Sequence, residues 1–106
     1  MLCSSRVLFV ALLLAVAACH PEYKVASFTT NEALYRSATE EFQHGRWENA
    51  VTAFEKLTTD LPARDTLLPR SHWFLARAHQ ERHEWVLAGA SFTRLDSKYA
   101  VGNILE

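Results

Sequence analysis

The sequence predicts an all-α protein in which two similar pairs of antiparallel helices pack side by side. Two observations support this prediction. Apolar residues recur at spacings of three and four through most of the chain, which places them on one face of a helix. In addition, the apolar pattern that begins at Trp47 is repeated from Trp85, a shift of 38 residues.

The clearest helix lies between Gly45 and Pro62. Its apolar face carries Trp47, Ala50, Val51, Phe54 and Leu57. Gly45 can adopt the positive φ that ends the preceding helix, and Pro62 lacks the N–H that another helical turn would need. We therefore expect this helix to stop near Asp60.

The second copy of this pattern contains Trp85, Ala88, Phe92 and Leu95, and its helix should end near Ser97. Each copy follows a helical stretch with its own small residue, Ala38 or Ala76. Two-helix repeats of this length are typical of tetratricopeptide solenoids, so we predict a tetratricopeptide-like α-α superhelix with two repeats. The residues expected to pack its helices together are Ala38, Gly45, Trp47, Ala50, Phe54, Ala76, Trp85, Ala88 and Phe92.

Residues 1–18 are typical of a secretory signal peptide. Arg6 supplies the positive charge, and Val7 to Ala18 form an uninterrupted apolar run. As a helix this run would span roughly 18 Å, short of the roughly 30 Å hydrocarbon core of a bilayer. The sequence Val16-Ala17-Ala18-Cys19 resembles the lipobox of bacterial lipoprotein precursors. That resemblance implies cleavage before Cys19 and acylation of its thiol; the alternative is an ordinary signal peptide followed by a chance cysteine.

The residue after the cysteine is His20 and not aspartate. By resemblance to enterobacterial lipoprotein sorting, this predicts a protein anchored by lipid to the periplasmic side of the outer membrane. Residues 19–30 would then be the lipidated cysteine and a short tether, because they contain Pro21 and have no helical period. Both cysteines, Cys3 and Cys19, lie near the N-terminus, so no disulfide framework is expected in the folded part.

The repeat domain is expected to span residues 31–106, with repeats at about 31–62 and 70–100. Solenoids usually need at least three repeats and a polar cap, and the residues after Ala100 provide neither. We therefore expect an incomplete domain, the N-terminal part of a longer protein. The alternative is a complete small protein whose open end is covered by a partner or a second copy.

Several local signals place the remaining boundaries. Thr29 and Glu32 have the spacing of a capping box, so the first helix should start there and end near Gln43. Pro62 to Pro69 is expected to be the loop between the repeats, with the third helix beginning around Arg70 or Ser71. Where the first repeat has Gly45, the second has His83, a residue that adopts positive φ at a greater cost.

The composition excludes several classes of function. The net charge of −1 provides no basic surface for nucleic acid. The three glycines, Gly45, Gly89 and Gly102, are too far apart for a dinucleotide- or phosphate-binding loop. No carboxylates are paired for acid–base chemistry, so we expect neither enzymatic activity nor a cofactor.

Two histidines, His79 and His83, are four residues apart and could share a helical face with His72. A zincin helix needs its glutamate directly after the first histidine, but here Glu81 comes one position later. We therefore expect no metal site, with His79 packed at the repeat interface and His83 in the turn. A metal-binding module through these two histidines is the alternative.

The first helices of two-helix repeats line a concave surface. The residues expected there are Tyr35, Thr39, Gln43, Trp73, Arg77 and Gln80, which we call the predicted groove. Aromatic rings can receive apolar side chains, and amide and guanidinium groups can bind backbone carbonyls or a carboxylate. The alternative is that these six residues are ordinary rim and core positions.

Four sequence motifs follow the lipobox and tether in order. They are A-L-Y-x-x-A at 33–38, E-F-x-x-G-x-W at 41–47, A-V-x-x-F-E-x-L at 50–57 and S-x-W-x-L-A-x-A at 71–78. From Cys19 to about Leu95 this order resembles the N-terminal part of BamD-type outer-membrane assembly lipoproteins, without the later repeats of that family.

The resemblance implies a periplasm-facing scaffold of the outer-membrane β-barrel assembly machinery. Such a scaffold binds unfolded barrel proteins and partner subunits of the assembly complex, and no bond is made or broken. The alternative is a generic tetratricopeptide-repeat lipoprotein that acts as an adaptor for cell-envelope or secretion complexes.

Overall fold

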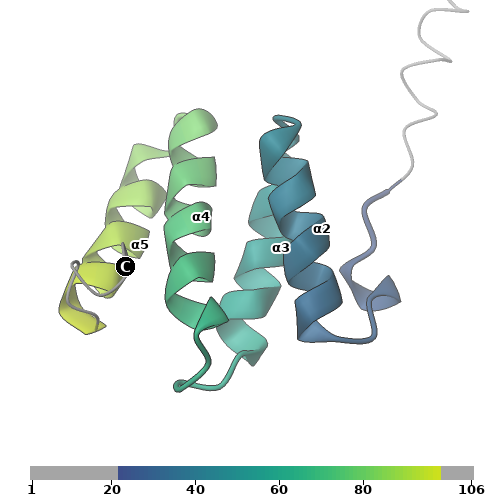
Figure 1. Cartoon of the computed structure of the whole chain (residues 1–106). Coiled ribbons are helices and arrows are strands. Elements are labelled where there is room, and N and C mark those ends of the chain that lie inside the picture. The colour runs from purple at the N-terminus through teal and green to yellow at the C-terminus, as the bar shows by residue number, and fades with distance from the viewer. Residues whose placement is uncertain (1–21, 99–106) are drawn as a thin grey trace, which may run out of the picture.

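The computed structural model describes residues 22–98 of the chain; the predicted signal peptide, Cys19 and the segment after Lys98 lie outside this range. The described residues form a 3-10 turn followed by four α-helices (Figure 1). These elements are η1 (Val25–Ser27), α2 (Asn31–Gln43), α3 (Trp47–Asp60), α4 (Leu67–Glu81) and α5 (Trp85–Lys98). No strand occurs between residues 22 and 98, so the predicted all-α class is confirmed.

The helices form two layers, with α2 and α4 in front of α3 and α5 (Figure 1). Each helix runs antiparallel to the one before it, so α2 and α4 point the same way. Helix α3 packs against both α2 and α4, whereas α5 packs chiefly on α4. This arrangement is compatible with two stacked helix-pair repeats, the first made of α2 and α3 and the second of α4 and α5.

The first repeat begins one residue later than the capping-box spacing predicted. Thr30, and not Thr29, is the N-cap of α2, because its backbone is extended and its hydroxyl oxygen accepts the N–H of Ala33 at 3.1 Å. The other boundaries of this repeat are as predicted. Gly45 has a φ of 72° after the end of α2, and α3 ends at Asp60 before Pro62.

The second repeat begins earlier than predicted. Helix α4 starts at Leu67 and not at Arg70 or Ser71, so Pro69 lies within its first turn. A proline is tolerated there because the first N–H groups of a helix have no acceptor within the helix. The N–H of Leu67 instead donates to Asp65 Oδ1 at 2.9 Å. The loop between the repeats is therefore shorter than the predicted segment from Pro62 to Pro69.

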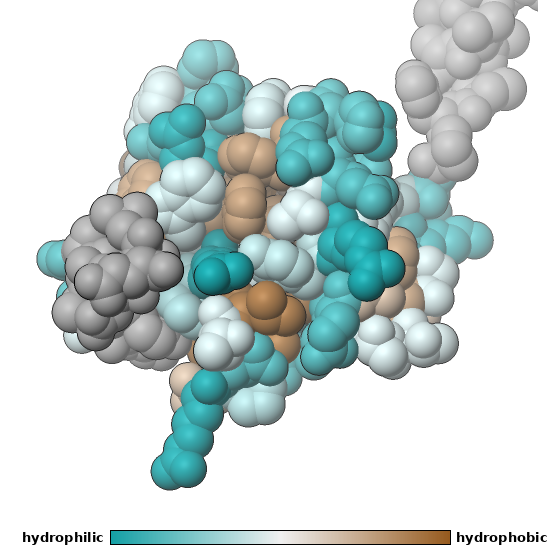
Figure 2. All heavy atoms as spheres, in the orientation of Figure 1, coloured by the Kyte–Doolittle hydropathy of each residue, from teal (hydrophilic) through white to brown (hydrophobic). Residues whose placement is uncertain are grey.

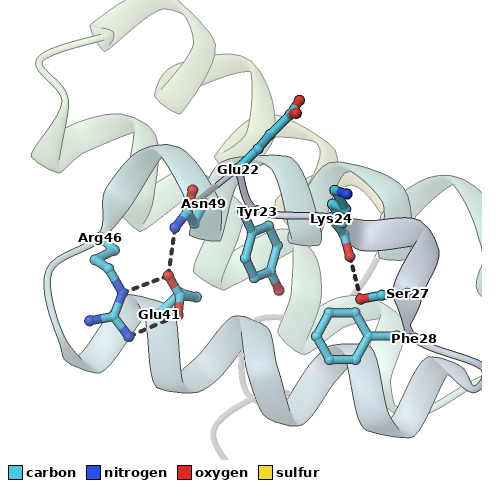
Figure 3. A pocket seen from close by; sticks show the side chains of 8 residues that line it. All are labelled: Glu22, Tyr23, Lys24, Ser27, Phe28, Glu41, Arg46 and Asn49. Carbon is cyan, nitrogen blue, oxygen red and sulfur yellow. Dashed lines mark hydrogen bonds and ion pairs between the residues drawn. The ribbon is translucent and has the colours of Figure 1, made fainter. Parts of the chain in front are cut away.

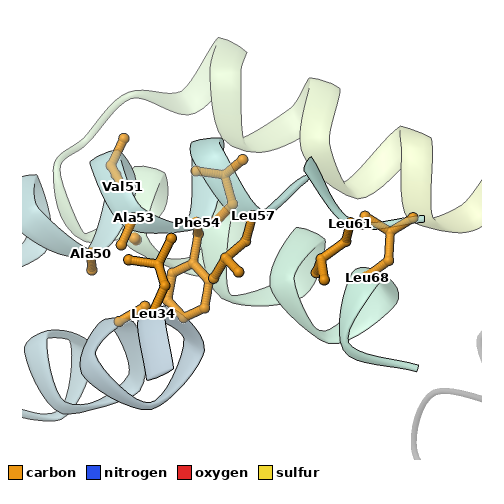
Figure 4. Close-up of a cluster of buried hydrophobic side chains, with 11 residues drawn as sticks. Leu34, Ala50, Val51, Ala53, Phe54, Leu57, Leu61 and Leu68 are labelled. Atoms are coloured by element: carbon orange, nitrogen blue, oxygen red, sulfur yellow. The ribbon is translucent and has the colours of Figure 1, made fainter. Parts of the chain in front are cut away.

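The core lies where α2, α3 and α4 meet (Figure 4). Phe54 is fully buried at its centre, and Tyr35, Phe42 and Phe74 pack around the buried cluster. That cluster comprises Leu34, Ala38, Ala50, Val51, Ala53, Phe54, Leu57, Leu61, Leu68, Leu75 and Ala78. The four alanines predicted at helix contacts, Ala38, Ala50, Ala76 and Ala88, are all buried.

The two tryptophans predicted as equivalent core residues differ. Trp47 is half-buried, with its ring 5.1 Å from that of Phe42. Trp85 is 62% exposed, so its prediction as a core residue is wrong. The reason is that Gln80 occupies the place equivalent to Phe42, 38 positions on, and offers no ring to pack on. Phe92 is also only half-buried, unlike its equivalent Phe54.

Part of the predicted tether packs on the helices. Tyr23, Val25 and Phe28 lie against the core, and the Tyr23 hydroxyl is 2.9 Å from Ser37 Oγ on α2. The Tyr23 and Phe28 rings are also in contact, with centroids 6.1 Å apart. The predicted tether is therefore wrong for residues 22–30, which form a docked segment; residues 19–21 lie outside the described range.

Candidate functional site

The second-repeat half of the predicted groove forms a connected row on α4. Trp73 is 37% exposed, and the guanidinium carbon of Arg77 lies 5.9 Å from the centre of its ring. Arg77 Nη1 donates a hydrogen bond to Gln80 Oε1 at 3.0 Å. An exposed ring, a cation and an amide are thus held beside one another within two helical turns.

Tyr35, the first groove residue on α2, is more enclosed than a groove residue should be. Its ring contacts Phe54 and Phe74 edge-on, at centroid distances of 6.1 and 6.3 Å. Burial raises the pKa of the Tyr35 phenol above its ordinary value, although nearby Arg70 opposes the shift. Tyr35 therefore belongs to the wall between the repeats and exposes only part of its ring.

Phe74 is the residue that sequence reasoning missed. Its ring stacks on Phe54 at 5.1 Å and meets Phe42 and Trp73 edge-on at 5.0 and 5.1 Å. It thereby connects the first repeat to the exposed Trp73. Phe74 has no signal in the repeat pattern, because its equivalent in the first repeat is Arg36. Edge-on and stacked ring pairs each stabilise such a junction by about 0.5–1.5 kcal/mol beyond the burial of their surface.

The other two groove residues, Thr39 and Gln43, follow Tyr35 at four-residue steps on α2. The Thr39 hydroxyl donates to the carbonyl of Arg36 at 2.8 Å, and Gln43 is exposed. Figure 2 views the face formed by α2 and α4 and shows apolar surface along the seam between them, flanked by hydrophilic residues. The predicted groove is therefore a shallow face with an apolar seam.

A pocket of about 670 Å³ lies beside the docked N-terminal segment (Figure 3). It is lined by Glu22, Tyr23, Lys24, Ser27, Phe28, Glu41, Arg46 and Asn49. No sequence pattern predicts this pocket, because it exists only where the segment predicted as a tether packs beside the α2–α3 turn. None of the six groove residues lines it.

The polar wall of this pocket is an ion pair that closes the α2–α3 turn. Arg46 donates to both oxygens of Glu41 at 2.7 and 2.8 Å, and Asn49 Nδ2 donates to Glu41 Oε2 at 2.7 Å. The hydrogen bond from Arg46 lowers the pKa of Glu41; partial burial opposes this effect and Asn49 adds to it. Three donors on one carboxylate make this a structural contact and not a free acid.

The α4–α5 turn is closed by an equivalent pair in which the acidic residue comes second in the chain and not first. His79 is buried and its Nδ1 lies 2.6 Å from Glu84 Oε2, while Arg82 Nη2 lies 2.9 Å from Glu84 Oε1. His83 sits in the turn with a φ of 60°, as predicted. Glu84 engages Nδ1 of His79. Residues 22–98 contain no group of three or more acidic, histidine or cysteine side chains that could hold a metal.

Comparison with protein-family models, with curated proteins and with solved structures finds no match for this chain. Within residues 22–98, no helix is both long enough and apolar enough to cross a bilayer.

Proposed function

We propose that this protein is a lipid-anchored scaffold of the outer-membrane β-barrel assembly machinery. Its helical repeats, arranged as a tetratricopeptide-like superhelix, bind unfolded barrel-protein segments and partner subunits on the periplasmic side. The observation that carries the proposal is the row of Trp73, Arg77 and Gln80 on the face shared by α2 and α4. The anchor is assigned to Cys19 because of the lipobox.

The row of Trp73, Arg77 and Gln80 could bind the C-terminal end of an extended polypeptide. The exposed face of Trp73 can cover an apolar side chain, and guanidinium groups bind carboxylates through paired N–H donors. Arg77 uses Nη1 for Gln80 and stays exposed. An unfolded barrel protein that ends in an apolar residue with a free carboxylate presents both partners at once. Phe74 holds Trp73 in place, so the row is ordered before a ligand arrives.

The row can be tested with a labelled peptide from the C-terminus of an outer-membrane barrel protein. Replacing Trp73→Ala and Arg77→Ala together should weaken its binding by about tenfold or more, because aromatic and arginine side chains dominate such contacts. Fluorescence anisotropy on the mature lipoprotein measures the dissociation constant. An amidated peptide should bind the original protein more weakly, since the carboxylate is then lost.

The matched control removes the same two residue types from another surface. Trp85→Ala with Arg82→Ala changes an exposed tryptophan and an exposed arginine at the α4–α5 turn. This variant should bind the peptide as the original does. Unchanged binding in a folded Trp73→Ala, Arg77→Ala variant would remove the row from the proposal.

Photo-crosslinking in cells separates barrel assembly from a general adaptor role in the cell envelope. A crosslinking residue in place of Gln43, which is exposed beside the seam, should capture barrel precursors or barrel-assembly subunits. Capture of cell-wall or secretion components instead would favour the adaptor.

A further inference from the structure

Three consecutive apolar residues are exposed in the first turn of α5. Trp85 is 62% exposed, Val86 86% and Leu87 51%. Single exposed apolar residues are common on protein surfaces, but an exposed run of three that includes tryptophan marks a contact site. We call these three residues the α5 patch.

The first repeat shows that this patch is not required by the fold. The equivalent positions are Trp47, Glu48 and Asn49, where the tryptophan packs on Phe42 and the next two residues are polar. Glu48 is exposed and Asn49 binds Glu41. The same helix start is thus built with polar residues in one repeat and with apolar residues in the other.

The position of the patch indicates what covers it. The α2–α3 and α4–α5 turns lie at the same end of the helices, so the patch is at that end (Figure 1). The described chain also begins near that end, because Glu22 lines the pocket with Arg46 and Asn49, and the segment then runs toward Phe28 at the start of α2 (Figure 3). Cys19 is three residues before Glu22, which limits its reach to roughly 10 Å.

We propose that the α5 patch inserts into the interfacial region of the lipid bilayer and forms a second membrane contact beside the anchor. This inference rests on the proposed lipidation of Cys19. Tryptophan favours the interface between headgroups and acyl chains, and adjacent valine and leucine side chains gain by leaving water there. With two contacts at one end, the helices stand away from the membrane and the face of α2 and α4 stays open to the periplasm.

The test uses the mature lipoprotein reconstituted in vesicles of phosphatidylethanolamine and phosphatidylglycerol. A nitrobenzoxadiazole fluorophore is attached to Val86→Cys, or to Ala63→Cys in the exposed loop at the opposite end. Acylation blocks Cys19 and signal cleavage removes Cys3, so the new cysteine is the labelled thiol; intact mass verifies both steps. Nitroxide-labelled lipids should quench the label at position 86 and leave the label at position 63 bright.

A second pair of proteins separates insertion from mere closeness to the membrane. Both proteins carry the label on Arg82→Cys in the adjacent turn. One keeps the α5 patch, and the other carries Val86→Glu and Leu87→Asn, which are the residues of the first repeat. Quenching by nitroxide lipids should be lost in this variant, whereas flotation with the vesicles should be retained through the lipid anchor.

Three results would overturn the membrane contact, and they differ in what they say about the lipid anchor. Protein that floats with vesicles while the label at position 86 stays unquenched overturns the membrane contact and leaves the anchor intact. Protection of that label from aqueous iodide without quenching by nitroxide lipids means that a second copy or another protein covers the patch, and also overturns the inference. Failure to float refutes the anchor itself, and the inference with it.

Discussion

The first helix pair is packed through apolar side chains, whereas the second pair buries polar ones at equivalent places. Leu34, Val51 and Ala53 of the first pair are all buried. Of their equivalents, 38 positions on, His72 and Ser91 are buried and Gly89 is exposed. For the positions on α3 and α5, the difference follows the number of packing neighbours. Helix α3 lies between α2 and α4 and needs apolar residues toward both, whereas α5 packs chiefly on α4.

The two helix pairs also differ in the ion pair that closes the turn between their helices. Glu41 and Arg46 close the first turn, and His79 and Glu84 close the second at the equivalent positions, so the acidic partner changes sides. Both arrangements join the end of one helix to the start of the next. A complementary pair thus closes each turn, with the acidic residue first in the chain in one repeat and second in the other.

The largest difference between the pairs is expected for their equivalent phenylalanines. Phe54→Ala should destabilise the protein by about 3–5 kcal/mol, because the ring is fully buried. Phe92→Ala should cost only about 1–2 kcal/mol, since part of its ring is already in water. Urea unfolding measures the free energy of unfolding of both variants, provided that its dependence on urea concentration (the m-value) is unchanged. If Phe54→Ala does not fold, Phe54→Leu gives a graded loss; equal losses at both sites would contradict the comparison.

Overpacking should affect both pairs similarly. Ala50→Leu and Ala88→Leu each put a large side chain into a buried helix contact and should cost about 1–3 kcal/mol. Ala63→Leu in the exposed loop is the matched control and should change stability by no more than about 0.5 kcal/mol. If either buried-alanine variant has the melting temperature of the original protein, the assigned helix contact is absent.

The two turns provide a test of opposite sign. Gly45→Ala should destabilise by about 1–2 kcal/mol, because only glycine adopts a φ of 72° without steric cost. His83→Gly should stabilise by about 1 kcal/mol or less, because relief of the strain at a φ of 60° is partly offset by loss of the ring contact with Trp85. Denaturant titration of the two variants should shift the midpoint in opposite directions.

The smallest expected effect comes from a single buried hydroxyl. Ser71 is fully buried and, within the described part of the chain, its Oγ has no hydrogen-bond partner; the first repeat has Ala33 at this place. Ser71→Ala should therefore stabilise by about 1 kcal/mol. The control Ser37→Ala removes a hydroxyl that pairs with Tyr23 and should destabilise instead. Calorimetric melting would show a higher midpoint for the first variant and a lower one for the second.

The spacing of the predicted groove residues along each helix is evident from sequence, whereas the enclosure of Tyr35 is not. Trp73, Arg77 and Gln80 lie on one helix, so their four- and three-residue spacing suffices to bring them together. Tyr35 is drawn into the core by Phe74, a residue from another helix for which spacing gives no information. The pocket near Tyr23 was missed for the same reason, since it depends on a segment folding back over a turn.

The sequence by itself determined which residues form helices, where most of those helices end and which alanines lie at their contacts. These features depend on hydrogen bonds and apolar spacing within a few residues, as at Gly45 and Asp60. Only the tertiary structure decided that Trp85 is exposed while Trp47 is covered, and that Phe74 joins the two repeats. Burial depends on what lies across an interface, and that partner is supplied by a part of the chain far away in sequence.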